Sequence, residues 1–153
     1  MDEQSYFQQQ TEVLQKVLDM HSDKRVCVVG TTCTGKSYFV KHLHGALDMD
    51  ELIFPLLSKD EQGYICQKPW TPDIGQAMTL FVRERVKIEA GKPVFGTVVI
   101  DSDILIYLWI SEHLLQQRVA FRGKNYEDAR NMQQQIETEV KRSGLRCIEF
   151  VVG

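Results

Sequence analysis

The residues best suited to chemistry lie in one short segment, residues 30–37, which reads G-T-T-C-T-G-K-S. This is the G-x-x-x-x-G-K-S spacing of a phosphate-binding loop, or P-loop. Gly30 and Gly35 permit backbone turns that a Cβ would obstruct, so successive N–H groups can face phosphate oxygens. Lys36 brings positive charge to the β- and γ-phosphates, and the Ser37 hydroxyl is suited to hold Mg²⁺. The segment therefore predicts binding of ATP or GTP together with Mg²⁺.

The flanking residues agree with this interpretation. Residues 25–29 form a short β-branched apolar run, which favours a strand buried on both faces. Residues 38–44 have the length of a helix that Gly45 ends, and the positive end of that helix would lie beneath the anion. The expected nucleotide-binding residues are Gly30, Thr31, Thr32, Cys33, Thr34, Gly35, Lys36, Ser37 and Tyr38.

Two carboxylates, Asp48 and Asp50, form a second candidate group at the end of a possible short strand over residues 46–50. Carboxylates two residues apart on a strand share a face, which suits joint contact with Mg²⁺ or an acceptor hydroxyl. The alternative is that Asp50 is the N-cap of a helix over residues 51–54 and has no chemical role. The two interpretations are nearly balanced, with a slight preference for a functional Asp50.

A third acid, Asp101, ends the run V-V-I-D, which is the pattern expected of a metal-binding carboxylate after a strand. However, Ile104 begins another apolar run almost at once, and a parallel crossover usually needs about a dozen residues. We therefore expect the strand to end near Gly96 and Thr97, with residues 98–103 as a compressed crossover. Gly96 and Thr97 would then face the acceptor, and Asp101 is a doubtful metal ligand.

Arg118 and Arg122 lie four residues apart on a helix predicted over residues 111–122, so they would share one face. Guanidinium groups can stabilise the charge that develops on a transferring phosphoryl group. The alternative is an ordinary solvated basic face.

The remaining pattern predicts one α/β domain over residues 1–153. Expected helices cover 1–21, a segment that begins at Thr71, 111–122 and 125–142, and expected strands include 93–97, 104–110 and 146–152. Such alternation favours a parallel sheet of about five strands with helices on both faces and residues 26–29 at its centre. Residues 51–70 show no clear period.

Composition narrows the function classes. The chain has 153 residues and a formal net charge of −3, so no basic field favours nucleic acid. No apolar run reaches the ~20 residues of a membrane span. The four cysteines show no C-x-x-C pairing, and with the polar N-terminal residues this predicts a cytoplasmic protein.

The loop and the run L-I-Y-L-W-I-S-E-H-L-L-Q-Q-R-V-A-F-R-G over residues 105–123 together resemble the P-loop kinases of nucleotides and small metabolites. This group holds the adenylate, shikimate, gluconate and uridine kinases, and the resemblance covers residues 25–152. It implies a three-layer P-loop NTPase fold, a lid at 118–130 that carries Arg118 and Arg122, and an acceptor or metal role for Asp48 and Asp50. The chain departs from the group in having only Gly153 after the last strand, where an adenine-contacting loop usually follows.

These observations predict an ATP-dependent kinase that transfers the γ-phosphoryl group to a small-molecule acceptor, with a nucleoside slightly favoured. Its expected catalytic residues are Lys36, Asp50, Arg118 and Arg122. The acceptor is expected over residues 51–70, where Phe54, Tyr64 and Trp70 could stack on it. One alternative is a regulatory nucleotide-binding module with weak or no ATPase activity, and another is a degenerate loop that holds only an anion.

Overall fold

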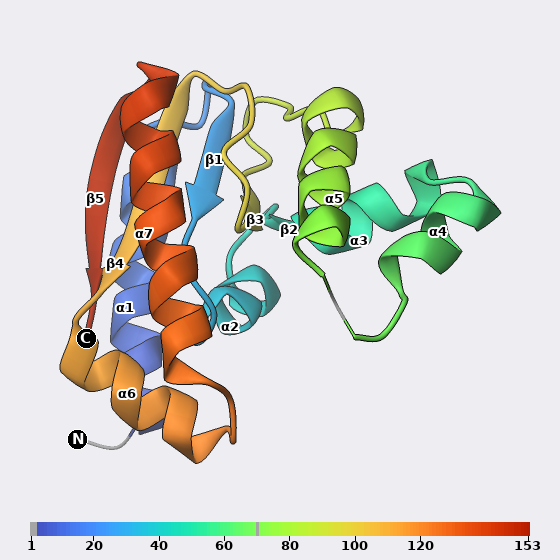
Figure 1. The fold of residues 1–153 in the computed structure, drawn as a ribbon. Helices are drawn as coiled ribbons and strands as arrows, with labels where there is room; N and C mark the ends of the chain where they lie inside the picture. Colours follow the sequence, from blue (N-terminus) through green and yellow to red (C-terminus); the bar gives the residue numbers. More distant parts are fainter. Residues whose placement is uncertain (1–2, 70) are drawn as a thin grey trace.

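A computed structural model describes residues 3–69 and 71–153 and shows a five-stranded, all-parallel sheet (Figure 1). The strand order is β2-β3-β1-β4-β5. The strands are β1 (Val26–Val29), β2 (Leu47–Asp48), β3 (Val94–Gly96), β4 (Ile104–Ile110) and β5 (Arg146–Val152). The predicted α/β class and the central position of the 26–29 strand are confirmed, since β1 pairs with β3 on one side and β4 on the other.

Helices account for most of the remaining described chain. They are α1 (Glu3–Asp19), α2 (Lys36–His42), α3 (Met49–Ile53), the 3₁₀ turn η1 (Phe54–Leu56), α4 (Lys59–Ile65), α5 (Pro72–Arg85), α6 (Glu112–Phe121) and α7 (Tyr126–Ser143). Thr71, Ser111 and Asn125 each accept a backbone N–H at the start of their helix, as N-cap residues do. None of the described helices is long and apolar enough to cross a membrane.

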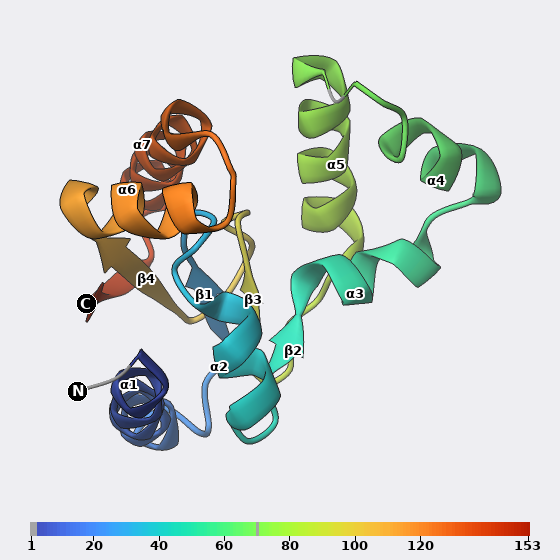
Figure 2. The same cartoon turned by 90° about the horizontal axis from the view of Figure 1, so that it is seen from below.

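Helices lie on both faces of the sheet (Figure 2). Helices α1 and α2 pack on one face, whereas α7 lies over the other and α6 crosses near the carboxyl ends of the strands. Alternate residues of β4 point to opposite faces: Leu105 and Tyr107 join one buried apolar cluster, and Ile106 and Leu108 join the other. Because β4 is buried on both sides, its sequence is apolar almost throughout.

The connection from β3 to β4 is the compressed crossover that the sequence predicts. It passes over β1 in residues 97–103 without a helix, and Val98, Val99 and Ile100 are buried along it. Such a short path suffices because β1 has only four residues. The Cys27 thiol, on β1, lies 3.7 Å from the Val98 carbonyl oxygen and so packs directly beneath the crossover.

Residues 49–85 form a helical lobe beside the sheet, made of α3, η1, α4 and α5 (Figure 2). Helix α5 is the helix predicted to begin at Thr71, whereas residues 51–70 show no helical period, and local signals explain α4. Ser58 and Glu61 form a reciprocal capping box, and Arg85 makes two bonds to the Glu61 carboxylate at 2.7 and 2.8 Å. Phe54 and Tyr64 are 44% and 38% exposed, and Trp70 lies outside the described residues.

Candidate functional site

The glycine-rich loop, residues 30–37, connects β1 to α2 at the carboxyl end of the sheet. The chain leaves β1 toward α2, which lies on one face of the sheet, and leaves its neighbour β4 toward α6 and then α7, which covers the other face (Figure 2). In open parallel sheets, ligands bind at this kind of switch point, beyond the carboxyl ends of the strands. The fold thus places the loop where a ligand site is expected.

Backbone conformation explains the second glycine of the loop. Gly35 has a φ of 96°, and a Cβ added there would lie 2.7 Å from the Phe7 ring. Cys33 also has a positive φ, of 66°, which is uncommon for a residue with a side chain. The loop therefore adopts a strained, specific shape that is held by its surroundings.

Two buried threonines hold the loop in place. The Thr31 hydroxyl donates to the Ala129 carbonyl of α7 at 2.6 Å, and the Thr34 hydroxyl donates to the Thr31 carbonyl at 2.9 Å. Both side chains are fully buried. These hydroxyl groups therefore stabilise the conformation of the loop. A phosphate could contact Thr31 and Thr34 only through their backbone N–H groups.

Lys36 directs its ammonium group into the loop. Its Nζ donates to the carbonyl oxygens of Gly30 at 2.7 Å and Thr31 at 2.6 Å. Burial lowers the Lys36 pKa to about 8, and the nearby carboxylate of Asp50 opposes this shift. A phosphate would have to replace these carbonyls as the partner of the ammonium group.

Asp48 and Asp50 are not on one strand, so the expectation of a shared strand face is wrong. The chain turns into α3 directly after Asp48, whose carboxylate caps that helix by accepting from the N–H groups of Asp50 and Glu51 at 2.8 and 3.3 Å. The alternative expectation of a helix start is therefore right, but the N-cap is Asp48 and not the expected Asp50. Asp50 lies near Lys36, and desolvation raises the Asp50 pKa, with Asp48 adding to the rise and Lys36 opposing it.

The two arginines have different surroundings. Arg118 donates to the Cys33 carbonyl of the loop at 3.0 Å, and its guanidinium lies 4.7 Å from the centre of the Phe7 ring. Arg122 is exposed at the C-cap of α6. The positive charge of Lys124 contributes to the lowered pKa of Lys36.

Helix α1 contributes to the site in a way that sequence reasoning missed. Phe7 packs on Tyr38, with ring centres 5.2 Å apart, and also lies against Gly35 and Arg118. Tyr38 stacks in turn on His42 at 4.1 Å. Phe7 lies in the N-terminal helix that the sequence predicts, but nothing in the sequence indicated which segment its side chain would cover.

Asp101 lies at the opposite end of the sheet. Its carboxylate pairs with Arg25 at 3.0 Å, before β1 begins, and its side chain is 82% exposed. The residue at the carboxyl end of β3 is Gly96, whose carbonyl accepts from the Gly30 N–H at 3.2 Å. Among the described residues no three His, Cys, Asp or Glu side chains form a group that could hold a metal on their own.

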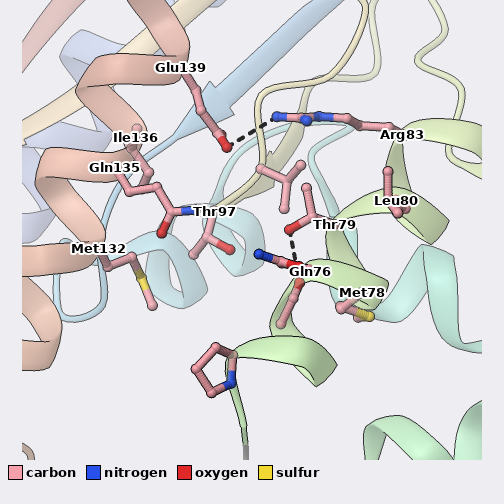
Figure 3. Close-up of a pocket in the computed structure, with 13 residues that line it drawn as sticks. Gln76, Met78, Thr79, Leu80, Arg83, Thr97, Met132, Gln135, Ile136 and Glu139 are labelled. Atoms are coloured by element: carbon pink, nitrogen blue, oxygen red, sulfur yellow. Dashed lines mark hydrogen bonds and ion pairs between the residues drawn. The ribbon is translucent and has the colours of Figure 1, made fainter.

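A pocket of about 680 Å³ lies between α5 and α7, beside the crossover (Figure 3). Its lining includes Thr97, which the sequence placed at the acceptor site, together with Gln76, Thr79 and Gln135. The lobe residues Phe54 and Tyr64, for which stacking on the acceptor was expected, are absent from the lining.

No protein-family model matches the sequence, and no curated protein shows significant similarity to it.

Proposed function

We propose that the chain is an ATP-dependent phosphotransferase with a P-loop NTPase fold, which transfers the γ-phosphoryl group to a hydroxyl of a small molecule. The observation that carries the proposal is the position of the G-x-x-x-x-G-K-S loop. It follows the central strand at the switch point of a parallel sheet, and it meets the start of a helix whose N-terminal N–H groups can face an anion.

The residues around the loop fit the parts that phosphoryl transfer requires. Backbone N–H groups of the loop would hold the phosphates, Lys36 would exchange its carbonyl partners for phosphate oxygens, and Ser37 would ligate Mg²⁺. Arg118, already bonded to the loop, would offer its guanidinium to the phosphates. Asp50 is the carboxylate near Lys36 that is best placed to act on the metal or the acceptor.

In this reaction the acceptor oxygen forms a bond to the γ-phosphorus while the bond from that phosphorus to the β–γ bridging oxygen breaks. ADP leaves with the electron pair of the broken bond. The hydroxyl proton passes to Asp50 or to solvent. Catalysis of this kind depends mostly on positioning and on stabilising charge, which is why the few charged groups at the loop suffice.

A specific observation favours a second candidate, a nucleotide-binding regulatory module. The carboxyl end of β3 carries Gly96 and not an acid, and Asp101 lies at the far end of the sheet. Such a module would bind MgATP but turn over slowly and without an acceptor.

The test compares Lys36→Ala with Lys41→Ala, which changes an exposed lysine on the same helix. MgATP should bind the wild type and Lys41→Ala with similar affinity in calorimetry, and Lys36→Ala should bind at least about tenfold more weakly, because it loses a charged partner of the phosphates. ADP release that depends on an acceptor would support the phosphotransferase. Slow release without an acceptor would favour the module, and equal affinity of all three proteins would contradict both.

A further inference from the structure

Phe7 of α1 lies where three parts of the candidate site meet. A Cβ added to Gly35 would lie 2.7 Å from its ring, so the ring packs directly on the backbone of the loop. The centre of the ring lies 5.2 Å from the ring centre of Tyr38 on α2 and 4.7 Å from the guanidinium carbon of Arg118 on α6. Only 7% of Phe7 is exposed, so these contacts belong to a closely packed arrangement.

The position of this ring is set by the packing of α1 and does not need a ligand. Helix α1 lies beside α2 (Figure 2), and Leu14 and Leu18 of α1 are buried in the same apolar cluster as Phe39 of α2. The Gln10 amide of α1 also donates to the Val151 carbonyl of β5 at 3.0 Å. Helix α1 is therefore anchored to both α2 and β5, and it presents Phe7 to the loop.

Arg118 is the residue of this arrangement that most needs support. An arginine side chain has several rotatable bonds and adopts many rotamers when nothing restrains it. Here the guanidinium donates to the Cys33 carbonyl at 3.0 Å and also lies over the Phe7 ring. A cation near the face of an aromatic ring is attracted to the negative charge of that face. The ring therefore favours the rotamers that keep the guanidinium at the loop.

The contact with Phe7 restrains Arg118 without neutralising it. A phenyl ring has no net charge and is not an acceptor for the strong hydrogen bonds that a guanidinium makes to oxygen. The Phe7 contact thus leaves the N–H groups of Arg118 able to meet phosphate oxygens. A cation that is already in place when charge develops needs no reorganisation during the reaction.

We propose that Phe7 is a positioning residue of the candidate site: its ring holds the Arg118 guanidinium at the loop, where the guanidinium meets the phosphates of a nucleotide. Phe7 acts through Arg118 and not on the phosphates. The restraint on Arg118 depends on the fold alone. Its effect on nucleotide binding rests on the proposed function.

The alternative is a purely structural role, in which any apolar side chain of suitable size at position 7 would serve. Phe7→Leu and Phe7→Met distinguish the two, because both replacements stay apolar and lack the ring. Phe150→Leu is the matched control. Phe150 lies on β5, is 9% exposed, and packs on Phe39 with ring centres 6.4 Å apart, so it belongs to the core beneath α1.

The first measurement uses the free protein and follows the motion of Arg118 by ¹⁵N relaxation of its Nε, assigned by the signal that Arg118→Ala removes. The order parameter should be that of a rigid group in the wild type and in Phe150→Leu. In Phe7→Leu and Phe7→Met it should fall toward the flexible range, below about 0.6. Equal order in the wild type and both Phe7 variants would overturn the proposal, as would an equal fall in Phe150→Leu.

Thermal melts show which variants are folded. If one replacement of Phe7 unfolds the protein, the other supplies the comparison. If both unfold it, the role of Phe7 is structural and the proposal is overturned.

The second measurement is a double-mutant cycle with MgATP in calorimetry. Phe7→Leu should weaken MgATP binding about fivefold to tenfold in the wild type. In the Arg118→Ala background the same replacement should have little further effect, because the residue through which Phe7 acts is gone. An equal loss of affinity in both backgrounds would show that Phe7 acts independently of Arg118 and would overturn the proposal.

The outcome is separable from that of the proposed function. If the wild type binds no MgATP, the proposed function is wrong, and the order of Arg118 in the free protein still decides whether Phe7 restrains it. If MgATP binding depends on Lys36 and is unchanged in Phe7→Leu, the role of Phe7 in the nucleotide site is overturned alone.

Discussion

Lys36 combines burial, charge and hydrogen bonds to its own loop, and this makes it the most informative single residue of the site. Its pKa is lowered from the ordinary value of 10.5 to about 8 by burial. The free loop therefore holds a cation that loses its proton more easily than an exposed lysine. Any anion that reaches the ammonium group will favour its charged form.

This shift predicts a pH dependence of nucleotide binding. Above pH 8 the free protein loses the Lys36 proton, and MgATP affinity should fall by up to about tenfold for each further pH unit, because binding must restore that proton. Calorimetry at pH 7, 8 and 9 in buffers of different ionisation enthalpy measures both the affinity and the proton uptake. Lys36→Met should show weak binding at all three values and no uptake linked to this residue.

The lowered pKa of Lys36 also makes the free energy of unfolding depend on pH. Between pH 8 and 10.5 the unfolded chain binds the Lys36 proton more tightly than the folded protein does. The contribution of this group to the free energy of unfolding should therefore rise with pH across that window. Urea titrations of the wild type and Lys36→Met should differ in this slope, and equal slopes would contradict the lowered pKa.

The two arginines should behave differently in mutagenesis. Arg118 touches the loop through the Cys33 carbonyl, whereas Arg122 is exposed. If the phosphotransferase proposal holds, Arg118→Ala should lower kcat by on the order of 10²-fold or more, by analogy with other arginines that stabilise phosphoryl transfer. Arg122→Ala serves as the control and should change kcat little. A large loss with Arg122→Ala would indicate that the end of α6 moves onto the nucleotide.

At the scale of elements, the crossover over residues 97–103 determines which carboxylates lie near the glycine-rich loop. Through this crossover, Asp103 and Asp101 reach Arg25 at the amino end of β1. Both carboxylates form ion pairs with Arg25 and raise its pKa. The crossover also leaves Gly96 at the carboxyl end of β3. The acid that acts most strongly on the loop lysine is then Asp50, which lies in α3.

This arrangement predicts opposite results for two Asp→Asn replacements. Asp101→Asn should leave the Mg²⁺ dependence of ATP binding unchanged, because its side chain is far from the loop and 82% exposed. Asp50→Asn should change the Mg²⁺ dependence or the turnover, because Asp50 interacts with Lys36. Titrations of ATP with and without Mg²⁺ measure this. A lost Mg²⁺ dependence in Asp101→Asn would contradict the assigned ends of the sheet.

Helix α7 connects the loop to the pocket, so its start should matter for stability. Asn125 caps α7 through a 3.1 Å bond from the Asp128 N–H. Asn125→Ala should lower the free energy of unfolding by about 1 kcal/mol, as for other N-caps. Asn131→Ala, at an exposed position within the same helix, should be neutral or slightly stabilising because alanine is the better helix former. Urea unfolding compares the two.

Elements with strong local signals could be predicted from the sequence. Strand β4 is apolar throughout, α5 has Thr71 and Pro72 at its start, and α7 ends at Gly144 in the left-handed conformation. Helices α3 and α4 of the lobe could not be predicted, because both are short and bury only one face each. Asp48 and Asp50 were wrongly predicted to share a strand. The strand ends at Asp48 after only two residues, and so short a strand cannot be distinguished from a helix start in the sequence.

At the scale of the whole molecule, one sheet joins two buried clusters. Leu105 and Leu108 of β4 are both fully buried, but they face opposite sides of the sheet. The position of the loop followed from the sequence because the G-x-x-x-x-G-K-S segment comes directly after an apolar run that predicts a strand. The α5–α7 pocket did not, because Gln76, Thr97 and Gln135 are brought together only by the tertiary fold.

This architecture predicts a single unfolding transition. Leu105→Ala and Leu108→Ala should each cost about 3 kcal/mol, since each leaves a cavity in a packed core. Circular dichroism and the fluorescence of the partly buried Trp109 should shift to lower urea together in both variants. Separate midpoints for the two probes would show that the two faces unfold independently.

The place of β1 in the sheet also has a consequence for the order in which the chain can fold. Cys27 pairs with Val94, and Val26 pairs with Ile104, so the central strand acquires both neighbours only after most of the chain has been made. Pairings so distant in sequence slow folding, because the entropy of closing long loops is lost before the contacts form. On the ribosome, β1 and its apolar residues should therefore stay unpaired until β3 and β4 emerge, and during that interval the nascent chain depends on protection from aggregation.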